Sequence, residues 1–153
     1  PEVDRERVVV HGLSGGGGLG IVTMALRPEV KAAVAGCPFM CAIGDAIQAV
    51  RTYPYNEIVC YLRAHPERRA QVLETLAYFD AVNFASRVDR PMAVQIGMED
   101  EVCPPQTSYA AYAALRGKKE VWLAPGAGHG SFPGYPEWEA SQLRRLLGIG
   151  TPG

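Results

Sequence analysis

Four short apolar runs constrain the fold of this chain more than any other feature of its sequence. The runs occupy residues 8–11, 32–35, 92–96 and 121–123. They lack the alternation of apolar and polar residues seen in half-exposed strands, which is typical of parallel strands covered on both faces. Helical stretches at residues 19–26, 106–115 and 137–147 separate or follow the runs. This rhythm of strands and helices predicts an α/β fold built on a parallel sheet.

A longer and mostly helical insertion separates the second and third predicted strands, at about residues 44–88. Pro66 is expected to open a helix there, since the first helical turn makes no use of the N–H that proline lacks, and Glu67 suits the positive end of the helix dipole. One apolar stripe follows, formed by Val72, Leu73, Leu76 and Ala77. We expect a single partial domain over residues 1–153, in which the insertion caps a site or forms an oligomer surface.

The composition excludes several classes of function. The 153 residues are 48% hydrophobic and 20% charged, with a net charge of −1 and no clustering of either sign. Nucleic acid and anionic membranes are therefore not expected as partners. The cysteines, at positions 37, 41, 60 and 103, fit neither a disulfide scaffold nor a zinc motif, and we expect buried or half-buried thiols and no metal. No signal peptide is recognisable, which favours a cytoplasmic location.

The first apolar run is expected to lie at an edge of the sheet. It carries no lysine or proline, the residues that commonly protect an exposed edge from pairing. We therefore expect further strands to pair with it, either from a missing N-terminal half or from another chain.

The sharpest local motif follows that first run directly. Residues 12–16 read Gly-Leu-Ser-Gly-Gly, which satisfies G-x-S-x-G at a turn from a strand to a helix. Such a turn strains the serine backbone and presents its Oγ above the sheet, and glycines on both sides let neighbouring chain approach closely. Ser14 is thus a candidate nucleophile, and the N–H of Gly15 at the helix start is a candidate donor to an oxyanion.

Two other interpretations of this turn compete with the nucleophile. Ser14 could simply cap the helix that follows. In addition, Gly15, Gly17 and Gly20 fit the dinucleotide pattern G-x-G-x-x-G, but that pattern needs an acidic residue at the end of the next strand. The next run ends in Gly36, Cys37 and Pro38 instead, which argues against a dinucleotide.

A base and an acid follow two later strands. His129 lies between glycines in a loop just past the fourth run, at the edge where open α/β sheets bind ligands. Asp100 follows the third run, where it could orient an imidazole, whereas its neighbours Glu99 and Glu101 are expected to be solvated. His11 and His65 are expected to be packed beneath the turn and on the surface, respectively. Ser14, Asp100 and His129 thus occur in the chain order typical of α/β-hydrolases.

The chain resembles the acetyl xylan esterase and cephalosporin-C deacetylase family of carbohydrate esterases over nearly its whole length. The segments that carry the resemblance are residues 12–17, 53–58, 75–80 with Asn83 and Ala85, 97–100 with Pro104 and Pro105, and 128–129. The resemblance implies the C-terminal half of an α/β-hydrolase fold, hydrolysis of acetyl esters of sugars or related small molecules, no cofactor, and a ring-like oligomer. It also implies Ser14 as nucleophile, His129 as base and Asp100 as its partner.

Three departures from the family pattern are visible. Gly15 stands where the family usually has glutamine, Gly130 stands where a glutamate is common, and the N-terminal half that supplies the second oxyanion donor is absent. With the resemblance and the candidate triad taken together, the sequence still predicts a serine esterase that acts on small acetylated substrates. Two alternatives stay open: another α/β-hydrolase, such as a broad carboxylesterase or a peptidase, and a non-catalytic or incomplete half that needs a partner.

Overall fold

The computed structural model describes residues 4–130 and 132–150. Within these ranges four parallel strands form one sheet in the order β1-β2-β3-β4. The strands are β1 (Val9–Leu13), β2 (Ala32–Gly36), β3 (Met92–Gly97) and β4 (Lys119–Ala124). This parallel order confirms the predicted α/β class. Each strand ends one or two residues beyond the predicted run, and β1 begins at Val9 rather than at Val8.

The register aligns the carboxyl ends of all the strands at one edge of the sheet. Leu13 pairs with Gly36, and Gly97 pairs with Ala124. The loops that follow the strands therefore meet at that edge, although they are far apart in the sequence.

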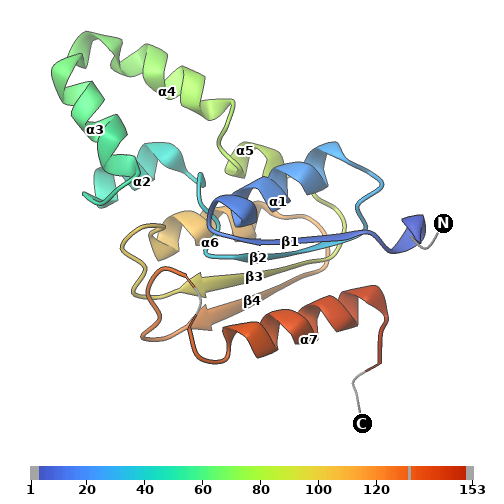
Figure 1. The fold of residues 1–153 in the computed structure, drawn as a ribbon. Coiled ribbons are helices and arrows are strands. Elements are labelled where there is room, and N and C mark those ends of the chain that lie inside the picture. Colours follow the sequence, from blue (N-terminus) through green and yellow to red (C-terminus); the bar gives the residue numbers. More distant parts are fainter. Residues whose placement is uncertain (1–3, 131, 151–153) are drawn as a thin grey trace.

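Helices cover both faces of the sheet (Figure 1). They are α1 (Gly15–Leu26), α2 (Ile43–Ala49), α3 (Tyr55–Ala64), α4 (Arg69–Ala77), α5 (Val82–Ala85), α6 (Pro105–Ala114) and α7 (Tyr135–Leu147), with 3₁₀ turns at Arg5–Arg7 and Pro66–Arg68. α1 and α6 lie on one face and α7 lies on the other. α1 begins at Gly15 rather than at residue 19, because packing of buried Gly17 and Gly18 outweighs the low helix propensity of glycine.

The main apolar core lies between the sheet and helices α1, α5 and α6. β2 and β3 are buried along their whole length, and Ile21 and Met24 of α1 pack against them. The expectation that all four strands are covered on both faces is wrong for β1 and β4, since His11 is exposed and Leu123 is 42% exposed. These two strands lie at the sheet edges, where each has a neighbouring strand on one side.

Helices α2, α3 and α4 form an arch above the side of the sheet where the strands end (Figure 1). A second apolar cluster holds the arch together, formed by Ile43, Ala46, Ile47, Val50, Tyr55 and Leu62, against which Val72, Leu73 and Leu76 pack. Ala77 is exposed, so the apolar stripe of α4 is narrower than predicted. Pro66 opens the 3₁₀ turn that leads into α4, in agreement with its expected place at the start of a helical segment.

A buried carboxylate fixes the base of the arch to the chain that follows β2. Asp80 accepts hydrogen bonds from the backbone N–H groups of Ala42 at 2.9 Å, Ile43 at 2.7 Å and Val82 at 3.0 Å. Hydrogen bonds to a charged acceptor are among the stronger ones in proteins. Asp80 therefore holds the segment that leads from β2 to α2, at the edge where the strands end.

β1 has a hydrogen-bonded neighbour, β2, on one side, and its other side pairs with no strand of residues 4–130 and 132–150. Its position at the sheet edge agrees with the sequence-based expectation. Within the same ranges, no helix has both the length and the apolar character that crossing a membrane requires.

Candidate active site

The turn between β1 and α1 holds Ser14 in an unusual backbone conformation. Its φ of 55° and ψ of −118° lie outside the regions that residues with a side chain normally adopt. Hydrogen bonds hold the turn in place: the Ser14 N–H donates to the Gly36 carbonyl at 2.8 Å, and the Ser14 carbonyl accepts from the Phe39 N–H at 2.9 Å. The neighbouring strand and the loop after it therefore maintain the strain at Ser14.

Glycine is required at some positions of this turn and not at others. A Cβ at Gly12 would lie 2.6 Å from the Gly16 backbone, and a Cβ at Gly18 would lie 2.0 Å from the Phe39 carbonyl oxygen. A Cβ at Gly15 or Gly16 would meet no atom within 4 Å. The expected need for glycine, to allow close approach of neighbouring chain, is therefore confirmed at Gly12, whereas a side chain would fit at Gly16.

The Ser14 side chain points toward a histidine rather than capping the helix. It makes no cap hydrogen bond to α1. Its Oγ lies 3.0 Å from Nε2 of His129, and the Nδ1 of the same ring lies 2.9 Å from Oδ2 of Asp100. The structure thus brings together the three candidates that the sequence placed after β1, β3 and β4. The capping alternative for Ser14 does not match this geometry.

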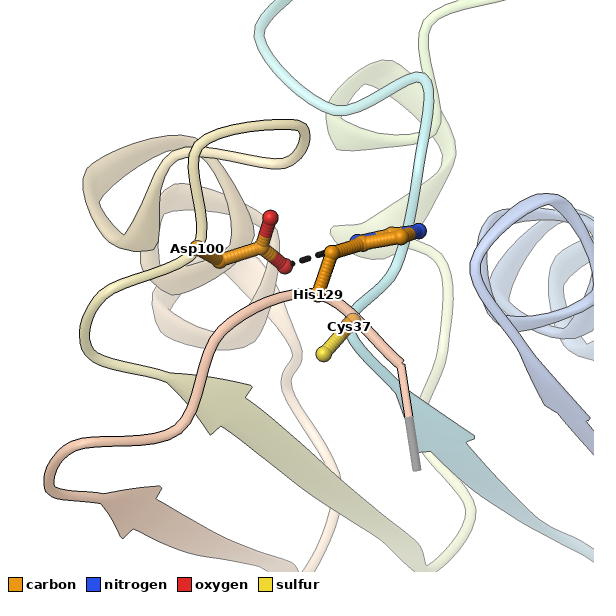
Figure 2. A group of neighbouring side chains, drawn as sticks. All are labelled: Cys37, Asp100 and His129. Carbon is orange, nitrogen blue, oxygen red and sulfur yellow. Dashed lines mark hydrogen bonds and ion pairs between the residues drawn. The ribbon is translucent and has the colours of Figure 1, made fainter. Parts of the chain in front are cut away.

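Asp100 is oriented by its own loop as well as by His129 (Figure 2). Its Oδ1 accepts from the N–H groups of Val102 at 2.8 Å and Cys103 at 2.7 Å, which leaves Oδ2 for the His129 ring. The Asp100 side chain is 1% exposed and that of His129 is 24% exposed. The imidazole therefore links a buried carboxylate to a hydroxyl that solvent can reach.

The hydrogen bonds at Asp100 decide its charge state. Burial on its own would raise the pKa of Asp100, but the hydrogen bonds from His129, Cys103 and Val102 outweigh burial and lower the pKa below its ordinary value of 3.8. Asp100 is therefore ionised near neutral pH. A buried anion beside Nδ1 favours the tautomer with the proton on Nδ1, which leaves Nε2 free to accept a proton from Ser14.

The other candidate residues lie away from this group. Glu99 and Glu101 are exposed, as expected. His11 does not pack beneath the turn: its side chain is 56% exposed, and its Nδ1 lies 3.2 Å from a carboxylate oxygen of Glu139. His65 lies in the arch with its side chain 44% exposed, and its Nδ1 lies 3.7 Å from a carboxylate oxygen of Glu67. Of the three histidines, His129 alone is at the edge where the strands end.

Two thiols that were not among the predicted site residues lie near this group. Cys37, the first residue after β2, is buried beside the Asp100 and His129 side chains (Figure 2). Cys103 is buried too, and its N–H is one of the donors to Asp100. Their positions directly after a strand end and beside the acid were the available signals. Cys41 is buried as expected, whereas the expectation of burial is wrong for Cys60, which is exposed on α3.

Comparison with known proteins identifies the family of this chain. A family model described as acetyl xylan esterase (AXE1) matches residues 1–145. The chain belongs to the acetyl xylan esterase family. Acetyl esterase Axe7A of Xylanibacter ruminicola is 34% identical to it over 126 residues, which are 82% of this chain and 28% of that protein. This confirms the family resemblance inferred from the sequence.

Solved structures of acetyl xylan esterases show the same fold. The enzyme from Paenibacillus sp. R4 superposes with a TM-score of 0.87 at 37% identity and covers 97% of this chain. Acetyl xylan esterase 1 from Thermoanaerobacterium sp. JW/SL YS485 superposes with a TM-score of 0.89 at 34% identity and covers 95%. This chain spans 47% of each of those two chains. The fold is thus that of an α/β-hydrolase, and the chain spans about half the length of these family members.

Proposed function

We propose that this protein is a serine esterase that removes acetyl groups from acetylated sugars or related small esters. The observation that carries the proposal is the continuous hydrogen-bonded series from the Ser14 Oγ through His129 to Asp100, with separations of 3.0 and 2.9 Å. A nucleophile, a base and a buried acid in this order are the parts that acyl transfer requires. Membership of the acetyl xylan esterase family supports the ester as substrate.

In the proposed mechanism, the Ser14 Oγ attacks the ester carbonyl carbon while its proton passes to Nε2 of His129. The Asp100 carboxylate stabilises the imidazolium that forms. The tetrahedral intermediate then collapses, the imidazolium gives its proton to the departing alcohol, and the acetyl group stays on Ser14. Water attacks this acyl group with His129 again acting as base, which releases acetate and restores the hydroxyl.

The Gly15 N–H is the proposed donor to the oxyanion. Gly15 is the first residue of α1, where backbone N–H groups have no intrahelical acceptor. None of the hydrogen bonds among residues 4–130 and 132–150 uses this N–H. The positive end of α1 also favours the developing negative charge.

The test is hydrolysis of p-nitrophenyl acetate by the protein and by its Ser14→Ala variant. Loss of the nucleophile should lower kcat by at least about 10³-fold, since removal of one member of such a group removes most of its catalysis. Ser86→Ala, which changes an exposed serine outside the site, is the matched control and should keep full activity. Equal turnover by the wild type and Ser14→Ala would rule out Ser14 as the nucleophile.

A comparison of substrates tests the proposed ester class. Acetyl esters should be hydrolysed faster than esters with longer acyl chains and faster than a peptide amide. Preference for long acyl chains would indicate a broad carboxylesterase instead, and cleavage of the amide would indicate a peptidase.

A second candidate function is supported by the edge strand. On one side, β1 pairs with no strand of the residues that the structure describes, and the chain spans 47% of two related esterases. An open apolar edge of this kind pairs readily with another strand. The protein would then act as one half of a hydrolase, completed by a second polypeptide segment or by another copy. An inactive wild type that elutes as a stable monomer in size-exclusion chromatography would contradict pairing between copies.

A further inference from the structure

Cys37, Asp100 and His129 form a compact group of potential metal ligands that the esterase mechanism uses only in part. The thiol sulfur, a carboxylate oxygen and a ring nitrogen all lie within 4.8 Å of one another. The residues come from the loops after β2, β3 and β4, and Figure 2 shows the sulfur beside the hydrogen-bonded acid and imidazole. In the part of the chain that the structure describes, this is the one group of three such side chains.

The donor set suits a thiophilic divalent cation. Zn²⁺ binds thiolate, imidazole and carboxylate at metal–ligand distances of about 2.0–2.3 Å, which places tetrahedral ligands about 3.3–3.5 Å apart. The observed 2.9 Å between His129 Nδ1 and Asp100 Oδ2 would need to widen by about 0.5 Å, and the distances to sulfur, at most 4.8 Å, would need to shorten by at most about 1.3 Å.

The chain on either side of His129 is packed differently. A Cβ at Gly126 or Gly130 would meet no atom within 4 Å, and both residues have a positive φ. Residues 127 and 128, by contrast, lie against Gly97, where a Cβ would come within 2.5 Å of the Gly128 carbonyl oxygen, so the movement falls to the His129 side chain and to Gly130. The His129 ring, which is partly exposed, also offers the way in from solvent.

The surroundings of the sulfur keep Cys37 as a thiol while no cation is bound. The side-chain amide of Gln95 lies 3.3 Å from the Cys37 Sγ, either with Oε1 accepting from the S–H or, when the amide is turned so that its oxygen accepts from the Ile96 and Gly97 N–H groups, with its NH₂ facing the sulfur. Burial raises the pKa of the Cys37 thiol and the neighbouring Asp100 carboxylate raises it further, while the backbone N–H groups of Gly130 and Gly97 oppose this rise because they favour the anion. The thiol therefore keeps its proton until a cation displaces it.

We propose that Cys37, Asp100 and His129 form an inhibitory binding site for Zn²⁺ and chemically similar cations. The ligands are the Cys37 Sγ, one Asp100 oxygen and His129 Nδ1, and water completes the coordination. This would be an inhibitor site rather than a cofactor site. The effect on activity rests on the proposed esterase function, whereas binding of the metal does not.

Inhibition follows from a change in which imidazole nitrogen carries the proton. When the metal takes the Nδ1 lone pair, the proton of the neutral ring moves to Nε2, which then donates to the Ser14 Oγ instead of accepting from it. The Cys37 thiol releases its own proton to solvent, so each bound ion frees one proton.

Binding is measured first, without reference to turnover. Zn²⁺ is titrated calorimetrically into wild type, Cys37→Ser, Cys60→Ser and Ser14→Ala, and Co²⁺ is added to each to detect the near-ultraviolet absorption of a thiolate-bound metal. Wild type, Cys60→Ser and Ser14→Ala should each bind one ion with the thiolate band. Cys37→Ser should lose the band and bind Zn²⁺ at least about 100-fold more weakly, since even outer-sphere partners are worth 10–100-fold.

Activity is measured second, on p-nitrophenyl acetate. Zn²⁺ should inhibit wild type and Cys60→Ser, EDTA should restore their activity, and Cys37→Ser should need at least about 100-fold more Zn²⁺ for the same inhibition. If Cys37→Ser does not fold, His129→Asn must lose both the ion and the band. A thiolate band that survives Cys37→Ser, or loss of the band in Cys60→Ser, overturns the site. Binding as expected in a chain that hydrolyses no ester would leave the site standing and refute the esterase proposal.

Discussion

Replacing Asp100 by asparagine tests the proposed role of the buried acid with little change in shape. Asp100 Oδ1 accepts two backbone N–H groups, from Val102 and Cys103, and Oδ2 accepts from His129 Nδ1. An asparagine must keep its oxygen toward the two N–H donors, because its NH₂ cannot accept from them. The NH₂ is thereby directed at His129, where it can donate only to an unprotonated Nδ1.

The magnitude follows from this reversal of the hydrogen bond. With Nδ1 as acceptor, the ring proton lies on Nε2, and the imidazole can no longer take the proton of Ser14. Loss of the correct tautomer in a Ser-His-Asp arrangement lowers kcat by about 10⁴-fold, which corresponds to about 5.4 kcal/mol. The folded state should lose only about 1–3 kcal/mol, because the two backbone N–H groups keep an acceptor.

The assay is steady-state hydrolysis of p-nitrophenyl acetate, with urea unfolding measured on the same samples. Glu101→Gln, a matched change at an exposed carboxylate of the same loop, should keep both activity and stability. The ¹⁵N chemical shifts of His129 should show the proton on Nδ1 in the wild type and on Nε2 in Asp100→Asn. Activity within tenfold of wild type in a folded Asp100→Asn, or an unchanged tautomer, would refute the reasoning.

Two further predictions concern stability. Hydrogen bonds hold the pKa of Asp100 below 3.8, so its ionised form should stabilise the folded state fully above about pH 5 and lose this effect as pH falls through the lower folded-state pKa. The unfolding free energies of wild type and Asp100→Asn, measured in urea from pH 7 to about pH 2, should therefore converge on acidification. A constant difference between them would contradict the lowered pKa. Gly18→Ala should lower the unfolding free energy by at least about 2 kcal/mol, since its Cβ would lie 2.0 Å from the Phe39 carbonyl oxygen. Gly15→Ala should instead raise it by up to about 1 kcal/mol, since that Cβ meets nothing within 4 Å. Thermal melts compare the two variants directly, and equal effects would show that the close approach at Gly18 does not matter.

Local sequence patterns were sufficient for the fold class and for the three central side chains. Apolar runs without alternation indicate buried parallel strands, and the most buried of them, β2 and β3, match the prediction best. Ser14, Asp100 and His129 could be proposed together because each follows a strand, and parallel strands deliver their following loops to the same edge. That rule depends on topology alone, so it needs no side-chain geometry.

The tertiary structure decided everything that depends on packing between distant segments. The start of α1 at Gly15 rests on close contact of Gly17 and Gly18 with the chain around β2, which periodicity does not reveal. The exposure of His11 and Leu123 likewise follows from what lies beside β1 and β4.

The thiol of Cys37 shows most clearly what the sequence alone could not predict. Its spacing to Cys41 matches no metal motif, and its partners Asp100 and His129 lie 63 and 92 positions away in the sequence. They become neighbours only because the parallel register brings the ends of β2, β3 and β4 side by side. The sequence by itself determined which residue types end each strand. Only the folded chain decided which of them meet, because side-chain distances across a sheet are set by register and packing rather than by position along the chain.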